Sequence, residues 1–234
     1  SYYLSHKMEN KAELLKEYAS VNFGMQLRNR KIFTNDVLVS PSPEVLSPYH
    51  RKCLTGKDIL DYVTFWNNRY CYFNEEARCG GCWIESLHNS KNKILVRQVG
   101  AVPVCGIDKE GLAVLNSAFM IVCKRINPFG TLGILNSKLI KFYWQLKFED
   151  KRKTFPKIKG TYLELLPIIP PTDEITRLVE NIVYLKEKSL SNDTSALEQK
   201  IDLLVYHLYG LTYDEVLIVD PETHITTEEY NNNQ

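Results

Sequence analysis

Short hydrophobic stretches separated by turn residues fill the first half of the chain. They are rich in β-branched and aromatic residues, which are typical of strands. The predicted strands cover residues 32–33, 37–39, 62–66, 70–73, 93–99, 102–107 and 112–123. Glycine, proline and asparagine stand between them. The turn at residues 108–111 separates two predicted strands, so we expect a hairpin there.

Helical spacing appears before and after these strands. Residues 7–19 are mostly polar, with leucines spaced as in a short amphipathic helix. Asn127-Pro128 is a helix start, and the hydrophobic positions from Leu132 to Leu146 keep the helical period. A basic loop follows, and then a predicted strand at residues 162–166.

Two further amphipathic helices are predicted after a proline-rich boundary at residues 167–171. Thr172 can cap the first, whose apolar positions run from 175 to 185. The second carries apolar positions from 197 to 208 and ends at Gly210, and residues 231–234 are expected to fray. A short polar loop joins these helices, so we expect an antiparallel pair. The predicted fold is α+β: a β-rich body with an embedded helix in residues 1–171, and a C-terminal helical segment in residues 172–234.

Charge is divided along the chain although the net charge is only +1. Residues 172–234 hold thirteen acidic and four basic side chains, a net charge of −9. The remaining fifteen acids and twenty-five bases give residues 1–171 a net charge of +10. Eight of these bases lie between Lys138 and Lys159. A basic body with an acidic end indicates a polyanion as partner of the body, although a solvated lysine-rich face would give the same pattern.

The composition is that of an ordinary globular protein, with 44% hydrophobic and 24% charged residues. No apolar run approaches the roughly 18–20 residues that a membrane span needs, so no membrane partner is expected. No signal peptide is visible at the start, and six cysteines are too few for a disulfide scaffold. We therefore expect a cytoplasmic location.

The motifs that carry catalytic chemistry are incomplete in this sequence. Short Glu-x-Lys patterns, part of the site of a metal-dependent nuclease, occur three times, as chance readily allows, and two of them fall in helical patterns instead of strands, so they identify no nuclease site. Cys79 and Cys82 have the spacing of a zinc knuckle, yet no second ligand pair follows. A glycine-rich turn with plain thiols, a zinc site and a redox pair remain open for this segment. We expect no catalytic residue, no metal and no cofactor.

Several segments, in order, resemble one family of DNA-recognition domains. They include Phe23-Gly24-Met25-Gln26 and the strand entry Leu54-Thr55-Gly56-Lys57-Asp58-Ile59. The others are residues 93–99, 114–117, 127–139, 153–159, 162–168 and 201–212. Together they resemble the TaqI-like C-terminal specificity domain of Type IIG restriction-modification enzymes and adenine-specific DNA methyltransferases, which is related to Type I specificity subunits.

The resemblance implies sequence-specific binding of double-stranded DNA. It also implies a methyltransferase or nuclease domain, in the same or a partner chain, that performs the chemistry, and a helical segment that spaces the body from that domain. The positions predicted to contact DNA are Lys57, Asn67, Asn68, Arg69, Arg97, Gln98, Lys151, Arg152, Lys153, Lys157 and Lys159. Arg97 and Gln98 are neighbours on a predicted strand and point to opposite faces, so only one of them can easily face DNA.

Two alternatives remain from the sequence alone. The chain could be a small nuclease with a divergent metal site. It could also be a protein-interaction module that uses its C-terminal helices, with an incidental basic body.

Overall fold

A five-stranded mixed sheet lies at the centre of the molecule in the computed structural model, which describes residues 1–152 and 154–232. In the order of neighbours, its strands are β2 (Ala19–Phe23), β12 (Ala118–Cys123), β9 (Lys93–Arg97), β10 (Cys105–Asp108) and β6 (Tyr62–Val63). All neighbours are antiparallel except β10 and β6. Together with the helices this confirms the predicted α+β class.

Both faces of this sheet are covered, and β9 shows it most clearly. Ile94 and Val96 belong to the main hydrophobic core under the helices, whereas Leu95 belongs to a smaller core with Leu54 and Met120. Alternate side chains of a strand point to opposite faces, so one short strand serves two cores. A strand buried on both faces reads as a continuous hydrophobic run, as β9 does.

A second sheet and a two-stranded ribbon lie beyond the smaller core. The sheet consists of β11 (Ala113–Val114), β5 (His50–Leu54), β7 (Arg69–Tyr72) and β4 (Val37–Val39). The ribbon pairs β3 (Gln26–Leu27) with β8 (Arg78–Gly80), and the short helix α2 (Glu85–His88) follows it. Buried His88 joins these parts, because its Nε2 bonds to the Cys82 carbonyl at 2.8 Å and its Nδ1 accepts from the Val114 amide at 3.0 Å.

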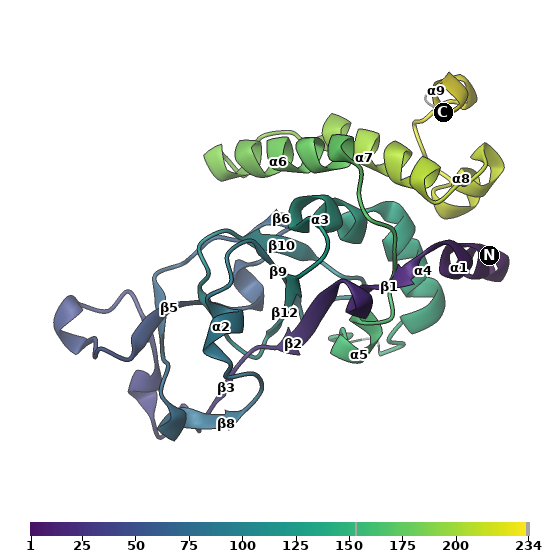
Figure 1. The fold of residues 1–234 in the computed structure, drawn as a ribbon. Coiled ribbons are helices and arrows are strands. Elements are labelled where there is room, and N and C mark those ends of the chain that lie inside the picture. The colour runs from purple at the N-terminus through teal and green to yellow at the C-terminus, as the bar shows by residue number, and fades with distance from the viewer. Residues whose placement is uncertain (153, 233–234) are drawn as a thin grey trace.

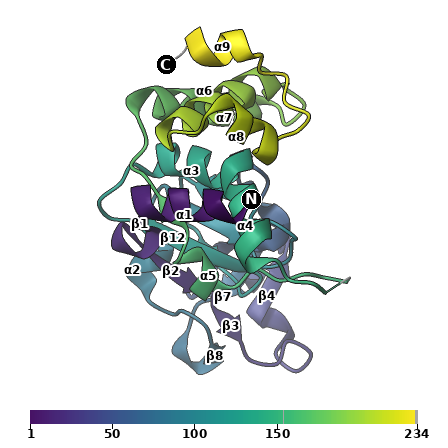
Figure 2. The ribbon, with the colours of Figure 1, turned by 90° about the vertical axis from the view of Figure 1, so that its right-hand side faces the viewer.

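Helices lie on the other side of the central sheet (Figure 1). They are α1 (Tyr2–Lys11), α3 (Pro128–Asn136), α4 (Lys138–Phe148), α5 (Gly160–Leu163), α6 (Asp173–Lys188), α7 (Ser195–Leu208), α8 (Tyr213–Val219) and α9 (Thr227–Asn232). Some of them lie on the sheet itself and others, such as α8 and α9, on neighbouring helices. We call residues 172–234 the helical layer and residues 1–171 the body; Figures 1 and 2 both show α6–α9 along one side of the molecule and β3 and β8 at the opposite side.

Helix α6 lies on α3 at close range because glycine lines the contact. A Cβ atom at Gly133 would come within 2.6 Å of the Val179 side chain, and one at Gly130 within 2.4 Å of Pro171. The main core is continuous across this contact, since it contains buried side chains of both the body and the helical layer.

The C-terminal helix pair forms where the sequence predicted it. Thr172 caps α6 through its side-chain oxygen, which accepts a bond from the Ile175 amide at 3.3 Å. Helix α7 covers the second predicted helix. Helices α8 and α9 were not predicted, and α9 includes Asn231 and Asn232 of the expected frayed tail. Residues 233–234 of that tail lie outside the described residues.

Several predicted elements were wrong in detail. Residues 32–33 form an exposed turn instead of a strand, and residues 7–19 contain the end of α1, the strand β1 (Glu13–Leu14) and the 3₁₀ turn η1 (Leu15–Glu17). The long strand predicted at 112–123 is β11 and β12 with a turn between them. The predicted strand at 162–166 is the end of α5 followed by a turn, and Pro167, expected to end it, opens the short strand β13 (Pro167–Ile168), which pairs with β1.

The turn at residues 108–111 does not close a hairpin. Its flanking strands β10 and β11 belong to different sheets. The turn is instead organised by Asp108, whose carboxylate accepts bonds from the amides of Glu110, Gly111 and Leu112 at 2.8–3.2 Å and pairs with buried Lys93. A turn satisfied by its own side chain needs no pairing of the strands beside it.

The single helix predicted from Leu132 to Leu146 is divided between two helices, α3 and α4, in the structure. The hydrophobic period from Leu132 to Leu146 continues through Ser137, but Ser137 adopts an extended backbone and caps α4 with its hydroxyl. Asp202 of α7 accepts a bond from the Lys138 amide at 2.9 Å. The break is thus fixed by a contact from a distant helix, which local spacing cannot reveal.

Candidate nucleic-acid interface

An open hollow of about 500 Å³ lies at the end of strand β9 in the central sheet. It is lined by Gly56, Lys57, Arg97, Val99, Ser117 and Phe155. These residues come from a 3₁₀ turn, η4 (Gly56–Asp58), the end of β9, the turn between β11 and β12, and the loop before α5. Segments far apart in the sequence therefore supply two cations, a hydroxyl and exposed apolar surface to one place.

Turn η4 holds Lys57 in position. The Asp58 carboxylate accepts a bond from the Thr55 amide at 2.8 Å, and the Gly56 amide donates to the Ser117 hydroxyl at 2.8 Å. A Cβ atom at Gly56 would lie 2.6 Å from the Ser117 carbonyl oxygen, so only glycine allows this approach. Lys57 itself is exposed and forms no ion pair within the described residues.

Arg97 is oriented by one bond and keeps its other donors available. Its Nε donates to the Ile59 carbonyl at 2.7 Å, which fixes the plane of the guanidinium group. Its terminal nitrogens have no partner in the described part of the chain. Gln98 lies next to Arg97 but does not line the hollow, in agreement with the expected opposite directions of the two side chains. The backbone amide of Gln98 donates to the Ser117 carbonyl, and the backbone carbonyl of Gln98 accepts from the Ile158 amide. Gln98 therefore joins the end of β9 to the basic loop.

Arg69 does not line the hollow but contacts Asp58, the residue after Lys57. Its guanidinium forms an ion pair with Asp58 at 2.8 Å, and the two side chains are only 16% and 3% exposed. Because Asp58 caps η4, Arg69 acts on the position of Lys57. Asn67 and Asn68 are exposed in the adjacent loop but do not line the hollow; Asn68 has a φ of 51°, and its carbonyl accepts a bond from the Ser40 amide.

The basic loop is attached to the same strand end. The Ile158 amide donates to the Gln98 carbonyl at 2.8 Å, and the Gly100 amide donates to the Pro156 carbonyl at 2.9 Å. This places the loop beside the hollow. The exposed cations of the loop are Lys151, Arg152, Lys157 and Lys159; the predicted contact Lys153 lies outside the described residues.

Not every cation of this loop is free. Asp150 accepts bonds from the Arg152 guanidinium at 2.8 Å and from the Lys157 amide at 2.8 Å. The Arg152 bond is the main reason that the pKa of Asp150 lies well below its usual range. Arg152 is thus largely committed to its neighbour, whereas Lys151 has no acidic partner in the described residues.

A second, smaller hollow adds side chains that the sequence analysis missed. It has a volume of about 150 Å³ and is lined by Met25, Gln26, Leu27, Arg30, Leu115 and Asn116. Asn116 precedes Ser117 of the larger hollow, so the two hollows are neighbours. We call the polar lining residues of both hollows the reading surface: Gln26, Arg30, Lys57, Arg97, Asn116 and Ser117. The sequence signal was present as the basic run at residues 28–31, which no local pattern linked to Lys57.

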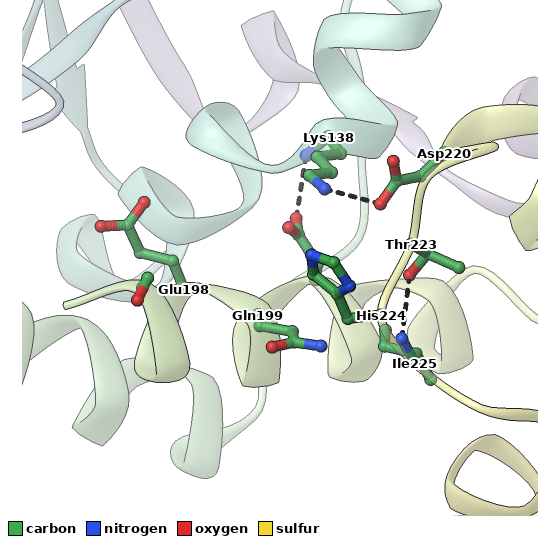
Figure 3. Close-up of a pocket in the computed structure, with 9 residues that line it drawn as sticks. Lys138, Glu198, Gln199, Asp220, Thr223, His224 and Ile225 are labelled. Carbon is green, nitrogen blue, oxygen red and sulfur yellow. Dashed lines mark hydrogen bonds and ion pairs between the residues drawn. The ribbon is translucent and has the colours of Figure 1, made fainter.

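A different hollow, of about 250 Å³, lies on the helical side and has the opposite electrostatic character. Figure 3 shows Asp220, Glu198 and His224 around it, with Lys138 bonded to two carboxylates. The Lys138 ammonium pairs with Asp220 at 2.6 Å. Burial raises the pKa of Asp202, which also lines this hollow, to about 6. Acidic groups repel phosphate, so this hollow is unsuited to DNA.

The cysteine turn is built by its backbone. Cys79 is exposed and Cys82 is half-buried against the smaller core. His88, one of the residues near them in sequence, uses both ring nitrogens in bonds to the protein backbone. Within the described residues, no group of three or more His, Cys, Asp or Glu side chains is arranged to hold a metal ion. The same residues contain no helix of the length and apolarity that a membrane crossing requires.

Comparisons with known proteins agree with the resemblance found in the sequence. Residues 51–168 match the family model described as the TaqI-like C-terminal specificity domain. This segment contains Lys57, Arg97, Asn116 and the basic loop, whereas Gln26 and Arg30 precede it. No curated protein matches the chain.

Three solved structures match this chain, and only the first of them has a TM-score above 0.5 and shows a similar fold. The Type IIL restriction-modification enzyme MmeI, solved in complex with DNA, matches with a TM-score of 0.59 and 11% identity over 94% of this chain and 36% of that chain. The HsdS subunit from Thermoanaerobacter tengcongensis matches with a TM-score of 0.45 and 10% identity over 89% of this chain and 50% of that one. A structure of a type I R-M system matches with a TM-score of 0.45 and 12% identity over 88% of this chain and 50% of that chain. This chain therefore spans half or less of the proteins it matches.

The family assignment rests on the family model, which covers half of the chain and includes most of the reading surface. The resemblance predicted from the sequence is confirmed. The chain belongs to the family of TaqI-like C-terminal specificity domains.

Proposed function

We propose that this chain recognises a DNA sequence for a restriction-modification system and performs no chemical step of its own. The observation that carries the proposal is the reading surface, where Lys57, Arg97 and Arg30 present unpaired cationic groups beside the amides of Gln26 and Asn116. Cations attract the phosphate backbone of any duplex, and Arg, Asn and Gln can read base edges. The reading surface contains both the cations that attract phosphates and the side chains that can read base edges.

Arg97 is the residue best prepared to read a base. The Ile59 carbonyl fixes its Nε, and its two terminal nitrogens face an open hollow. A guanidinium held in this way can donate two bonds to O6 and N7 of a guanine in the major groove. Gln26 and Asn116 offer the paired donor and acceptor that suit adenine.

The lysines have a different role. Lys57 and the basic-loop residues Lys151, Lys157 and Lys159 are exposed side chains on flexible stems. Ammonium groups of this kind neutralise phosphates and carry no sequence information. Asn67 and Asn68 lie on a neighbouring loop and would extend the contact to a flanking phosphate or base. Arg69 serves as a positioning residue through Asp58.

The partner of the chain would be an adenine methyltransferase or nuclease domain, attached as in Type IIG enzymes or carried by a separate chain in the cytoplasm. The helical layer, residues 172–234, would be the spacer that docks to it. Two features support this role: the layer lies on the opposite side of the molecule from β3, which carries Gln26, and its net charge of −9 disfavours contact with DNA.

Selection from a random duplex pool would test the recognition function. We expect the chain to enrich one short sequence, and its affinity for that sequence to fall steeply as salt rises. Arg97→Ala should cost roughly 1–3 kcal/mol on the selected duplex and little on random DNA. Arg177→Ala, an exposed arginine on α6, is the matched control and should bind as wild type.

Two results would contradict the proposal. Enrichment of no sequence would remove the recognition function and favour a protein-interaction role for the helical layer. Magnesium-dependent cleavage of duplex DNA by the isolated chain would revive the nuclease alternative. An equal loss for Arg97→Ala on every duplex would reduce Arg97 to a phosphate contact.

A further inference from the structure

Residues 28–33 form a loop whose base is firmly held. The Arg28 guanidinium bonds to both carboxylate oxygens of Asp36, at 2.9 and 3.2 Å, and lies 3.7 Å over the ring of Phe33. The Arg28 amide donates to the Ala77 carbonyl at 2.8 Å. These contacts join the loop to the second sheet and to the segment before β8.

The turn at the tip is also fixed by its own bonds. The Asn29 carbonyl accepts bonds from the amides of Ile32 and Phe33 at 3.1 and 2.9 Å. The Asn29 side chain accepts a third bond from the Lys31 amide at 3.0 Å. A turn with three internal bonds holds its shape before any partner arrives, so little conformational entropy is lost on binding.

The side chains at the tip have no partners. Arg30 and Lys31 are exposed and form no ion pair or side-chain hydrogen bond in the part of the chain that the structure describes. Ile32 stands beside them with 70% of its surface exposed. A single exposed isoleucine is common on protein surfaces and means little alone. Here it projects from a turn that is held by internal bonds, and it directly follows two exposed cations that have no partner in the described residues.

The tip is continuous with the reading surface. Arg30 lines the smaller hollow together with Gln26 and Asn116. On the far side of Ser117, the larger hollow reaches Val99, where the basic loop is attached. The reading surface thus has a basic element at each end: the basic loop at one and the tip of residues 28–33 at the other.

We propose that Ile32 is a wedge that enters the minor groove and inserts between adjacent base pairs, while Arg30 and Lys31, which precede it on the same turn, bind neighbouring phosphates. This inference rests on the proposed recognition of duplex DNA and adds deformation of the duplex to it. Proteins that insert an apolar side chain flanked by basic residues bend the helix by roughly 20–90°. The wedge makes recognition depend on base steps that unstack easily, so sequence is read also where no side chain bonds to a base.

Bending of a labelled duplex tests this role of Ile32. The probe is the duplex recovered from the random pool, with a donor and an acceptor dye at its ends. Binding of the wild-type chain should raise energy transfer by shortening the distance between the ends. Ile32→Ala should bind about tenfold more weakly or worse, because the apolar surface of the wedge no longer leaves water, and should leave the duplex nearly straight.

Two controls separate the wedge from other effects. Ile218→Ala removes an isoleucine from α8 that is 41% exposed, and should change neither affinity nor energy transfer. Arg30→Ala together with Lys31→Ala should lower affinity and flatten its salt dependence. Thermal unfolding of the Ile32 variant should match wild type, because the side chain has few protein contacts to lose.

The outcomes distinguish this inference from the proposed function. If wild type selects a sequence but leaves it straight, or if Ile32→Ala bends it as wild type does, the wedge is wrong while recognition stands. If wild type binds no duplex, both are wrong. Weaker binding and a lost bend for Ile32→Ala, with Ile218→Ala unchanged, would establish the wedge.

Discussion

The body and the helical layer carry opposite net charges and use their charged side chains differently. Acids of the layer pair with lysines of the body: Glu215 with Lys7 at 2.6 Å, Asp220 with Lys138 at 2.6 Å, and Glu187 with Lys109 at 3.0 Å. These lysines lie at the layer, and its acids offset their charge. The cations of the reading surface have no such partners in the described residues.

This difference changes how the charge pattern is understood. The excess of bases in residues 1–171 correctly indicated a cationic body, but several of those bases neutralise the helical layer. Lys138, which opens the densest basic stretch of the sequence, pairs with Asp220 and lines an acidic hollow. The proposed DNA-binding face is therefore better defined by cations left unpaired after folding than by the density of lysine along the sequence.

The strongest test of the comparison asks whether body and layer are one folding unit. Val179 on α6 is fully buried against Gly133 of α3. Val179→Asp would place an unpaired charge in the shared core and should cost more than about 3 kcal/mol, because a buried charge without a partner loses its hydration. Urea unfolding should then show one transition, shifted as a whole.

The control for this change is Leu190→Asp, at a position that is 52% exposed. Its effect should stay within about 0.5 kcal/mol. If Val179→Asp unfolded the helical layer alone and left the body with its wild-type transition, residues 172–234 would form a separate unit, as the predicted boundary at residue 171 implies.

How much the sequence could predict differs between the two regions for a physical reason. Helices α6 and α7 are stabilised by contacts three and four residues apart, so spacing and the Thr172 cap located them. Strands such as β6 and β11 have two residues each and exist only through partners far away in sequence. Nothing local distinguishes the two halves of residues 112–123, because the break at Asn116 is made by pairing with different sheets.

The candidate site shows the same limit. Lys57 and Arg97 were predicted from motif resemblance, and the fold places them in one hollow. Arg30 and Asn116 were missed because their segments meet only through pairing of residues far apart in the sequence, such as the bridge between Met25 and Leu115. Arg69 was predicted as a base contact, but its buried pair with Asp58 cannot be seen in the sequence.

A pH titration would perturb the body at a point away from the helical layer. Burial lowers the pKa of His88 to about 4 in the folded protein, from an ordinary value near 6.5. Between these values the unfolded chain binds more protons than the folded one, so stability should fall as the pH decreases from about 6.5 to 4. The loss should reach at most about 3 kcal/mol at pH 4.

Asp202 in the helical layer acts in the opposite direction. Its pKa is raised to about 6 by burial, so its protonation below that pH relieves the cost of a buried charge and stabilises the fold. Wild type and Asp202→Asn are therefore unfolded in urea at several pH values: the slope that remains in Asp202→Asn carries the His88 contribution, and the difference between the two proteins gives that of Asp202. Without Asp202 the loss toward acid should be steeper; an unchanged or shallower slope would contradict these assignments.

The basic loop can be tested against the paired lysines of the layer contact. Changing Lys151, Lys157 and Lys159 to Ala should weaken binding to all duplexes about equally and reduce the salt dependence by up to about one unit of slope per lost phosphate contact. Changing Lys109, which pairs with Glu187, should leave the salt dependence as it is. Titrations of labelled duplexes at several salt concentrations measure both. Equal effects of the two changes would mean that pairing within the protein does not decide which lysines meet DNA.

The smallest effect is expected at the cysteine turn, which lies in the body close to the reading surface. The turn is fixed by its backbone: the Cys82 amide donates to the Phe23 carbonyl at 3.1 Å, and the Cys82 carbonyl accepts from His88 at 2.8 Å. Both bonds survive the replacement of the two sulfur atoms. Cys79→Ser with Cys82→Ser should therefore cost less than about 1 kcal/mol, mainly through the half-buried Cys82 side chain, and should leave DNA binding unchanged. Stoichiometric zinc in the purified chain, together with unfolding by a chelator, would show instead that the sulfur atoms hold this part of the body together.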